Sequence, residues 1–471
     1  MSATGEARPG APVGAAGSTP TATDPLEARL TALSPEALAR IREAFHAHLH
    51  AGDAVQLQAC VHCGVCAESC HYARTDDDPR ATPAYKLDLV ASVFRRELTW
   101  LGRVAPHWVG ARDLDAGLAR EWVDTLFGRC TLCGRCMVNC TIGIDVPTLV
   151  RAARGALAAG GLVPPELQAT VDTAVASGNN MGIPRDEWVE TVRWLEEELQ
   201  AETGDPSARM PLDEPGAAFL YTVNPREPKF YPLSLLATAT LFHAAGERWT
   251  LSSDAYDLTN YGYFSGDDEA AALFAGRLIE AARRLGAGTI VIGECGHGFG
   301  ANRWHAAGWL DGAPGIQVKS VLEVVRGYIR DGRLRLDPSR LARPVTLHDP
   351  CNLVRLGGIV EEPREILAAT VARVVEMTPN REQNFCCGGG GGQLSMTRFA
   401  PRRLAAGRVK ADQIRATGAA VVATPCHNCV DQLTELSRHY KLGVEVKTIC
   451  ELVAAALVPP GPTTRAPEAS R

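Results

Sequence analysis

The chain has 471 residues, of which 46% are hydrophobic and 22% are charged, and its formal net charge is −6. This length is too great for one ordinary domain and predicts about three, each able to bury a core. The mild negative charge argues against nucleic acid as the main partner.

Both ends of the chain are rich in small residues and proline. Residues 1–25 and 458–471 predict disordered tails, and the first of them has neither the basic region nor the apolar run of a secretory signal. No apolar run reaches the roughly 18 residues that a spanning helix needs. We therefore expect a cytoplasmic protein that is peripheral on the cytoplasmic membrane face at most, through a partner subunit. Fifteen cysteines in such a compartment indicate metal or redox chemistry.

The segments between the tails predict an α + α/β fold. Residues 26–165 have mostly helical periodicity, with prolines at the expected helix starts, and we predict a helical ferredoxin-like domain with two clusters. A helical connector follows at 166–215. Strand-like apolar runs then alternate with helical runs, which is typical of βα units. They predict two α/β lobes, at 216–335 and 336–457.

The two lobes have similar sequences and predict a duplication. "LIEAARRLGAGTIVIGECGHGFGANR" and "RVKADQIRATGAAVVATPCHNCVDQL" share a helix, a glycine turn, a β-branched strand and a cysteine-bearing turn. Aligning Cys295 with Cys426 pairs the other cysteines of the second lobe with different residue types: Cys429 with Gly298, Cys386 with Ala255, and Cys387 with Tyr256. The first lobe is therefore predicted to be a degenerate copy that lacks most of its cysteines.

Eight cysteines form two copies of one motif, C-x2-C-x2-C-x3-C, in "CVHCGVCAESC" and "CTLCGRCMVNC". This spacing is typical of two cubane [4Fe–4S] clusters, in which the fourth thiolate of each motif binds the other cluster. The rule assigns cluster one to Cys60, Cys63, Cys66 and Cys140, and cluster two to Cys130, Cys133, Cys136 and Cys70. Structural zinc is the weaker alternative, because zinc sites usually pair two C-x2-C knuckles.

The two motifs show three further features. Gly64 and Gly134 allow a tight turn inside each motif. His71 and Thr141 stand where a proline usually follows the fourth cysteine. The long intervening segment, residues 71–129, predicts extra helices, and we expect its three tryptophans to pack in the core rather than form a docking face: Trp100, Trp108 and Trp122.

Five further cysteines lie in three loops of the second lobe: Cys351 in "LHDPCNLVR", Cys386 and Cys387 in "NFCCGGGGGQ", and Cys426 and Cys429 in "TPCHNC". Five thiols exceed the four that tetrahedral zinc takes. All three loops follow strand-like runs, and sites in open α/β sheets lie at the carboxyl ends of strands. We expect the glycines after Cys387, including Gly388, Gly389 and Gly390, to leave clearance for a cluster against the main chain.

This cysteine pattern resembles the CCG-domain family of the catalytic subunit of heterodisulfide reductase, over about residues 215–455. The resemblance implies that Cys351, Cys386, Cys387, Cys426 and Cys429 bind a noncubane [4Fe–4S] cluster that cleaves disulfides, with electrons fed by the two cubanes. "CHYARTDDDPRATPAYK", the single intact site and "GECGHG" are most similar to the DsrK-type subunit of the sulfite-reduction-associated membrane complex. The resemblance also implies a membrane partner of the cytochrome b type. It implies a disulfide or trisulfide as the substrate, for example one carried by a small sulfur-carrier protein.

Residues beside the cysteines are candidates for stabilising a departing thiolate by charge or by a proton: His348, Arg355 and His427. For each histidine, a hydrogen bond that holds its loop is the favoured interpretation. Cys295, with His297 two residues later, is either a residual thiol that faces the substrate or a packing residue.

Two other functions remain open. The chain could be an electron-transfer subunit of a flavin-linked or 2-hydroxy-acid dehydrogenase, or a non-catalytic docking module.

Overall fold

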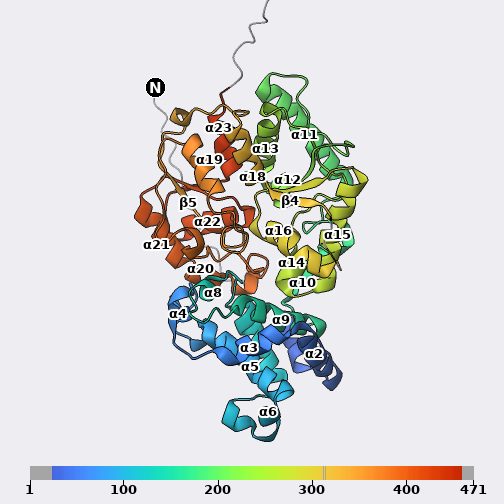
Figure 1. The fold of residues 1–471 in the computed structure, drawn as a ribbon, viewed down its shortest axis with the longest axis vertical. Coiled ribbons are helices and arrows are strands. Elements are labelled where there is room, and N and C mark those ends of the chain that lie inside the picture. Colours follow the sequence, from blue (N-terminus) through green and yellow to red (C-terminus); the bar gives the residue numbers. More distant parts are fainter. Residues whose placement is uncertain (1–23, 311, 313–314, 459–471) are drawn as a thin grey trace, which may run out of the picture.

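The computed structural model describes residues 24–310, 312 and 315–458. Most of both predicted tails, residues 1–23 and 459–471, lies outside the described residues. A helical N-terminal unit forms one end of the molecule, and two α/β units stand side by side on it (Figure 1).

The N-terminal unit contains nine α-helices and three short turns of 3₁₀- or π-helix among the described residues. They are α1 Pro25–Thr31, α2 Pro35–His48, α3 Ala51–Ala59, α4 Val65–Ser69, η1 Pro79–Ala81, α5 Pro83–Leu98, α6 Trp100–Val104, η2 Pro106–Val109, α7 Ala116–Trp122, η3 Val123–Phe127, α8 Arg135–Val138 and α9 Val146–Ala159. Helices α1 and α2 begin at a proline behind a capping Asp24 or Ser34, which confirms the prediction for these starts.

Two helices, α10 Pro165–Ser177 and α11 Arg185–Thr203, lead into the first α/β unit. Its four strands are parallel and lie in the order β2-β1-β3-β4. The elements are β1 Phe219–Thr222, α12 Arg226–Phe230, α13 Pro232–Ala244, β2 Trp249–Thr250, α14 Tyr261–Ser265, α15 Asp268–Arg284, β3 Thr289–Ile292, α16 Gly296–Gly300, η4 Ala301–His305, α17 Ala306–Trp309, β4 Gln317–Ser320 and α18 Val321–Arg330.

The second α/β unit has a parallel sheet of three strands in the order β5-β6-β7. Its elements are η5 Pro338–Arg340, β5 Val345–Leu347, α19 Glu362–Thr370, η6 Arg381–Gln383, η7 Thr397–Phe399, α20 Ala400–Ala406, α21 Arg408–Thr417, β6 Val421–Ala423, α22 His427–His439, β7 Glu445–Lys447 and α23 Ile449–Ala456. The small parallel sheets and abundant helix confirm the α + α/β class. The domain boundaries stay predictions.

The hydrophobic core explains how the units are held together. One cluster of buried side chains runs through both α/β units, from Leu220 on β1 to Val453 on α23. A second cluster fills the helical unit and takes in Phe264 of α14 and Met396, so apolar packing also joins the units to one another. Burial of this shared surface fixes the cysteine loops of the three units relative to one another.

The expectation for the tryptophans is right for Trp122 and wrong for the other two. Trp122 is fully buried, whereas Trp100 and Trp108 are 75% and 86% exposed. Both exposed side chains lie at α6 and η2, and α6 marks the tip that projects farthest from the α/β units in Figure 1. The apolar residues of this segment did not reveal that the tip is left uncovered by the other residues that the structure describes.

Across the described ranges, none of the helices is long and apolar enough to cross a membrane.

Candidate iron–sulfur site

The two ferredoxin-type motifs have the same backbone conformation. The third residue of each motif, His62 or Leu132, has a φ of 55°, and the glycine two residues later has a φ of 81° at Gly64 or 75° at Gly134. Each glycine then starts a short helix, α4 or α8. These left-handed positions favour glycine and turn the chain so that successive thiols converge.

Two cavities divide the eight thiols into two sets. The first cavity is lined by Cys60, Cys63, Cys66 and Cys140. The second is lined by Cys70, Cys130 and Cys133, and Cys136 lines both cavities. If the fourth cysteine of each motif binds the other motif's cluster, two sets of four cysteines are predicted. Apart from the shared Cys136, the two cavities contain these two sets.

The second cavity also suits an anionic group. Lys86 lines it, is 1% exposed, and donates from Nζ to the carbonyl of Ala81 at 2.6 Å. Burial raises the pKa of the Cys130 and Cys136 thiols, and the positive charge of Lys86 opposes that rise. The thiols and the buried charge therefore fit a [4Fe–4S] cluster.

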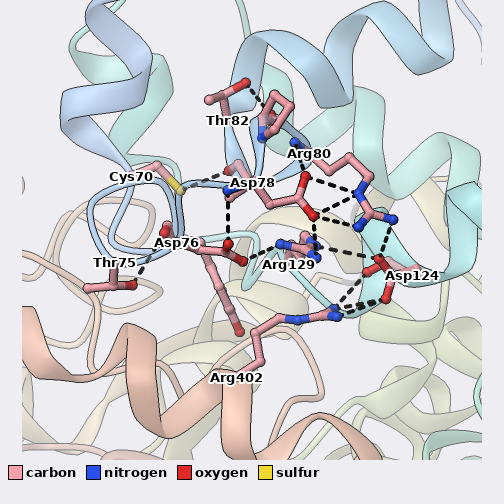
Figure 2. Close-up of polar contacts among 12 residues, drawn as sticks. Cys70, Thr75, Asp76, Asp78, Arg80, Thr82, Asp124, Arg129 and Arg402 are labelled. Carbon is pink, nitrogen blue, oxygen red and sulfur yellow. Dashed lines mark hydrogen bonds and ion pairs between the residues drawn. The ribbon is translucent and has the colours of Figure 1, made fainter.

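Figure 2 shows an ion-pair network that joins both motifs to the second α/β unit. Arg129, immediately before the second motif, is 4% exposed and pairs with Asp76 and, at 2.9 Å, with Asp78, just after the first motif. Asp124 accepts from Arg129 at 3.5 Å and from Arg402 of α20 at 3.0 Å. The buried guanidinium holds the two motifs at a fixed separation.

The five predicted ligands of the second unit converge. Cys351 and Cys426 follow the strands β5 and β6, as predicted, whereas Cys386 and Cys387 follow η6 and not a strand. All five are buried, at 1% to 7% exposure, and free. Cys351 Sγ lies 3.9 Å from Cys386 Sγ, and Cys387 Sγ lies 3.5 Å from Cys429 Sγ. Cys426 is the fifth cysteine of the set. It is the N-terminal cap of α22 and hydrogen bonds to Cys429.

The pKa values of the five thiols diverge. Hydrogen bonds to neighbouring cysteines and burial raise the pKa of Cys351 and of Cys429 well above the usual value, whereas Cys387 and Cys426 are poised to be thiolates. Hydrogen bonds from Cys386 and Cys429 hold the pKa of Cys387 well below its usual range, and bonds from Cys295 and Cys429 do the same for Cys426. The amide of Gly388 donates to Cys386 Sγ at 3.3 Å, which adds a backbone donor to the site. Buried, convergent thiolates with amide donors fit an iron–sulfur cluster.

A sixth thiol joins this group from the first α/β unit. Cys295 caps α16 and hydrogen bonds to Cys426, and its Sγ lies 3.2 Å from Nδ1 of His297. The backbone N–H of His427 donates to the carbonyl of Glu294 at 3.0 Å, so the two cysteine-bearing turns lie directly against each other. The structure thus places Cys295 beside Cys426 and also inside the apolar core of the α/β units, and its role stays a prediction.

The three flanking residues lie in different environments. His348 is fully buried, and one of its ring nitrogens lies within 4.8 Å of the sulfurs of Cys387 and Cys429. Burial and the nearby ammonium of Lys410 lower the pKa of His348 well below its usual value, so the ring is neutral. His348 is therefore placed to contact a sulfur but not to supply positive charge.

Arg355 holds the cysteine loops through their backbone. Its guanidinium donates to the carbonyls of Cys133 and Glu382, both at 2.6 Å, and to that of Asn384. Cys133 belongs to the second ferredoxin-type motif, whereas the other two acceptors lie just before Cys386. Arg355 thereby links the two cysteine sites.

His427 binds across the interface between the two α/β units. Its Nε2 lies 3.0 Å from Ser234 Oγ, and its Nδ1 lies 3.2 Å from the carbonyl of Glu294. Burial lowers the pKa of His427, but the carboxylates of Glu227 and Glu294 outweigh burial and raise it. These contacts match a histidine that holds its loop, and the expected role toward a departing thiolate stays a prediction.

The second ferredoxin-type motif touches the five-cysteine site. One ligand atom from each of His71, Cys133 and Cys386 lies within 4.8 Å of the others. Phe385, next to Cys386, stacks under the guanidinium of Arg135 at 3.7 Å. The two cysteine sites are therefore contiguous inside the protein.

The glycine run makes close contacts with protein atoms. A Cβ on Gly391, whose φ is +63°, would lie 2.7 Å from the backbone of Thr131, inside the second ferredoxin-type motif. A Cβ on Gly389 would lie 2.9 Å from Gln432 Cβ, and Gly388 has a φ of +101°. The clearance that these glycines give is toward neighbouring chain segments, and the cofactor-contact role of Gly388, Gly389 and Gly390 stays a prediction.

Arg154 is a central residue that sequence reasoning missed. It is fully buried on α9 and donates to the carbonyls of Leu126, Cys130, Phe264 and Gly391 at 2.8 to 3.2 Å. These acceptors come from all three units. The signal was the second of two arginines in the largely apolar helix "VPTLVRAARGALAA", where a buried charge needs partners.

Comparison with known proteins agrees with this geometry. Residues 56–144 match the 4Fe-4S dicluster domain family, and residues 345–434 match the CCG family, a cysteine-rich domain. The chain is 29% identical to an Hdr-like menaquinol oxidoreductase iron-sulfur subunit of Archaeoglobus profundus, across 86% of this chain and 80% of that protein. It is 25% identical to one subunit of the dihydromethanophenazine:CoB–CoM heterodisulfide reductase of Methanosarcina mazei, across 87% of this chain and 96% of that protein.

A third relative, the EtfAB:quinone oxidoreductase of Syntrophomonas wolfei, is 22% identical across 81% of this chain and 55% of its own length. The two matched domains carry all thirteen predicted cluster ligands. The chain is a heterodisulfide reductase-related CCG protein, an iron–sulfur oxidoreductase in which a 4Fe-4S dicluster domain precedes the cysteine-rich domain.

Proposed function

We propose that the protein carries electrons through two cubane [4Fe–4S] clusters to or from a noncubane [4Fe–4S] cluster, where a disulfide or trisulfide is reduced or formed. The contact between Cys133 and Cys386 carries this proposal, because it brings the second ferredoxin-type motif against the five-cysteine site. In the reducing direction a disulfide takes up two electrons and two protons, its S–S bond breaks, and two thiols leave.

The proposed ligands are the thirteen cysteines of the three sets. Cubane one takes Cys60, Cys63, Cys66 and Cys140, cubane two takes Cys70, Cys130, Cys133 and Cys136, and the noncubane cluster takes Cys351, Cys386, Cys387, Cys426 and Cys429. When bound, these groups supply single electrons and an iron that can hold one sulfur of the substrate. The chain's own part is to favour the thiolates of Cys387 and Cys426, to exclude water by burial, and to present His348 beside the sulfurs.

The two α/β units are proposed to be a duplicated pair. Cys295 and Cys426 both follow a central strand, cap a helix and have similar φ values, −149° and −164°. The strands β4 and β7 both lead into a helix that begins with a capping box, at Ser320 and Thr448. These shared features support a common origin, in which the first unit kept only one thiol.

A membrane cytochrome b-type subunit is the proposed partner, and the DsrK-type subunit is the proposed subtype. The tip formed by the end of α5, by α6 and by η2 exposes four large apolar side chains at 44% to 86%: Leu98, Trp100, Val104 and Trp108. Exposed apolar and aromatic side chains on one tip are typical of an interaction surface. The relatives' names mention menaquinol and dihydromethanophenazine, which are consistent with electron exchange at a membrane. A small sulfur-carrier protein is the proposed source of the substrate sulfur.

An electron relay without sulfur chemistry is the second candidate. The likeness to an EtfAB:quinone oxidoreductase favours it, because that name describes electron exchange between a flavoprotein and a quinone. A relay needs no iron open to a substrate. The EPR spectrum of such a relay is therefore expected to stay unchanged when thiols are added.

Iron analysis and electron paramagnetic resonance (EPR) on anaerobically purified protein test the proposal. We expect about twelve irons per chain, from three clusters of four. The oxidised protein should change its EPR spectrum when 2-mercaptoethanol is added. About eight irons with zinc, or a spectrum that ignores every thiol, contradicts the sulfur chemistry.

A ligand variant and a matched control sharpen this test. Cys387→Ser should leave about eight irons and remove the thiol-dependent signal. Cys450→Ser is the control, because Cys450 is equally buried but lies in the apolar core on α23. Equal iron content in the two variants contradicts the assignment of Cys387.

A further inference from the structure

Lys410 is a buried lysine beside the five-cysteine site. It lies on α21 and is 0% exposed, and its Nζ donates to Asn384 Oδ1 at 2.5 Å and to Met377 Sδ at 3.5 Å. Asn384 stands two residues before Cys386. Met377 packs in one cluster of buried side chains with three of the predicted ligands: Cys387, Cys426 and Cys429. Both neighbours of the ammonium therefore belong to the surroundings of the cysteines.

Lys410 forms no ion pair with a carboxylate of the described residues. An ammonium has three donors, and the two groups that accept from it, an amide oxygen and a thioether sulfur, are uncharged. Among the acids, Asp349 favours the charged lysine most strongly, but its carboxylate is already paired with Arg364 at 2.8 Å and accepts from the backbone N–H of Arg381 at 2.7 Å. A buried cation without a paired anion is costly, so Lys410 requires a further negative group nearby.

The cysteines are the negative groups that lie within electrostatic reach of Lys410. Burial lowers the pKa of Lys410 to about 8, whereas Asp349 and then Cys387, Cys386 and Cys429 act in the opposite direction. After burial, Lys410 is also the largest cause of the lowered pKa of His348, whose ring lies within 4.8 Å of Cys387 and Cys429. The ammonium thus acts on the same small volume in which the sulfurs converge.

A second buried lysine occupies the corresponding place at the ferredoxin-type motifs. Lys86 and Lys410 are the two buried lysines among the residues that the structure describes, and Lys86 lines the cavity of the second motif. Lysine is almost never fully buried unless it is paired with an anion. One such lysine at each of these two cysteine sites indicates that both sites hold negative charge.

We propose that Lys410 is the charge partner of the cluster at the five-cysteine site, where its ammonium offsets the negative charge of the thiolates and makes that cluster easier to reduce. The proposal rests on the proposed function. It assigns to Lys410 the positive charge that the neutral His348 and the backbone-bound Arg355 do not bring to the sulfurs. An added electron increases the negative charge of a cluster, and a nearby cation stabilises that state. Lys410 acts through the cluster, so it is a positioning residue.

Three variants separate charge from packing and from position. Lys410→Met keeps an unbranched side chain of similar length and removes the charge, and Lys410→Arg keeps the charge. Lys86→Met is the matched control, because Lys86 is 1% exposed but lies at the other cysteine site. Loss of the charge at Lys86 should therefore act on the ferredoxin-type clusters.

The assay is a redox titration of the cluster-loaded protein in 2-mercaptoethanol, monitored by EPR, together with iron analysis. We expect about twelve irons in the wild type and in all three variants. In Lys410→Met the redox equilibrium of the thiol-dependent signal should move about tenfold toward the oxidised form, which is about 59 mV for one electron. The same signal should stay within about threefold of the wild type in Lys410→Arg and in Lys86→Met.

The outcomes separate this inference from the proposed function. If the wild type binds about eight irons, or if its spectrum stays unchanged when thiols are added, the proposed function fails and this inference fails with it. If the wild type behaves as proposed and Lys410→Met titrates like the wild type, only this inference is overturned. An equal shift in Lys86→Met also overturns it, because the effect would then not be specific to the site.

Iron content decides the case in which Lys410→Met binds only about eight irons. About twelve irons in Lys410→Arg would then support the role of the charge. About eight irons in both variants would overturn it, because the shape of the lysine side chain and not its charge would be what the site requires.

Discussion

Replacement of Arg154 tests whether one buried guanidinium ties the three units together. The variant Arg154→Met keeps the length of the side chain and removes all of its donors. Hydrogen bonds from a charged donor to four carbonyl oxygens contribute about 1.5 kcal/mol each, or roughly 6 kcal/mol together. Burial opposes this gain, because it lowers the pKa of Arg154 from 12.5 to about 10, which corresponds to roughly 3 kcal/mol.

The hydrogen bonds exceed the burial cost by about 3 kcal/mol, so we expect the junction to open roughly a hundredfold more often in Arg154→Met. Anaerobic hydrogen exchange measured by mass spectrometry reports this directly. Peptides that contain Cys130, Phe264 and Gly391 should lose protection by about that factor, since these segments lose their common donor.

Arg277→Met is the control for this measurement. Arg277 also donates to two carbonyls, those of Ala174 and Val175, but it is only partly buried and contacts a single segment. Water can replace its bonds, so exchange should change by less than about threefold. A similar small change in Arg154→Met would refute the reasoning, because burial cost and hydrogen bonds would then cancel.

Three further predictions concern other parts of the molecule. Gly391→Ala should lower the melting temperature more than Gly443→Ala, because both have a φ near +65° but only the first would clash with backbone. Burial raises the pKa of Asp257 to about 7, so its stabilising contribution is complete at low pH and is lost as the pH rises toward 7. Asp257→Asn should flatten the decline in melting temperature between about pH 4 and 7, and an unchanged slope would contradict this. Trp108→Ser should reduce the fraction of protein that sediments with membranes, whereas Trp194→Ser, on the exposed side of α11, should not.

Local patterns predicted the parts of the site that depend on local geometry. The spacing of the two ferredoxin-type motifs was enough to predict which thiols share a cavity, because the motif itself turns the chain through Gly64 and Gly134. The alternation of strands and helices likewise predicted that Cys351 and Cys426 lie at one sheet edge, since parallel strands end there together.

Contacts between distant segments could not be predicted in the same way. The pairing of Cys295 with Cys426 depends on how two α/β units face each other, and the clash at Gly391 depends on a loop 260 residues earlier in the chain (391 − 131). The exposure of Trp100 had no local signal either, because an apolar pattern does not say whether a neighbour covers it.

The thiols differ in their burial, and this difference predicts the order in which oxygen damages the proposed clusters. Cys63 is the only exposed cysteine in the described part of the chain, the other seven ferredoxin-type cysteines are half-buried, and the five predicted ligands of the second α/β unit are buried. Oxygen and chelators reach clusters through accessible sulfur, so damage should begin at the Cys63 end. In partly oxidised samples we expect the cluster at the buried five-cysteine site to remain intact but to be cut off from the cubane clusters that supply its electrons. Electron transfer would then be lost before iron is lost from the five-cysteine site.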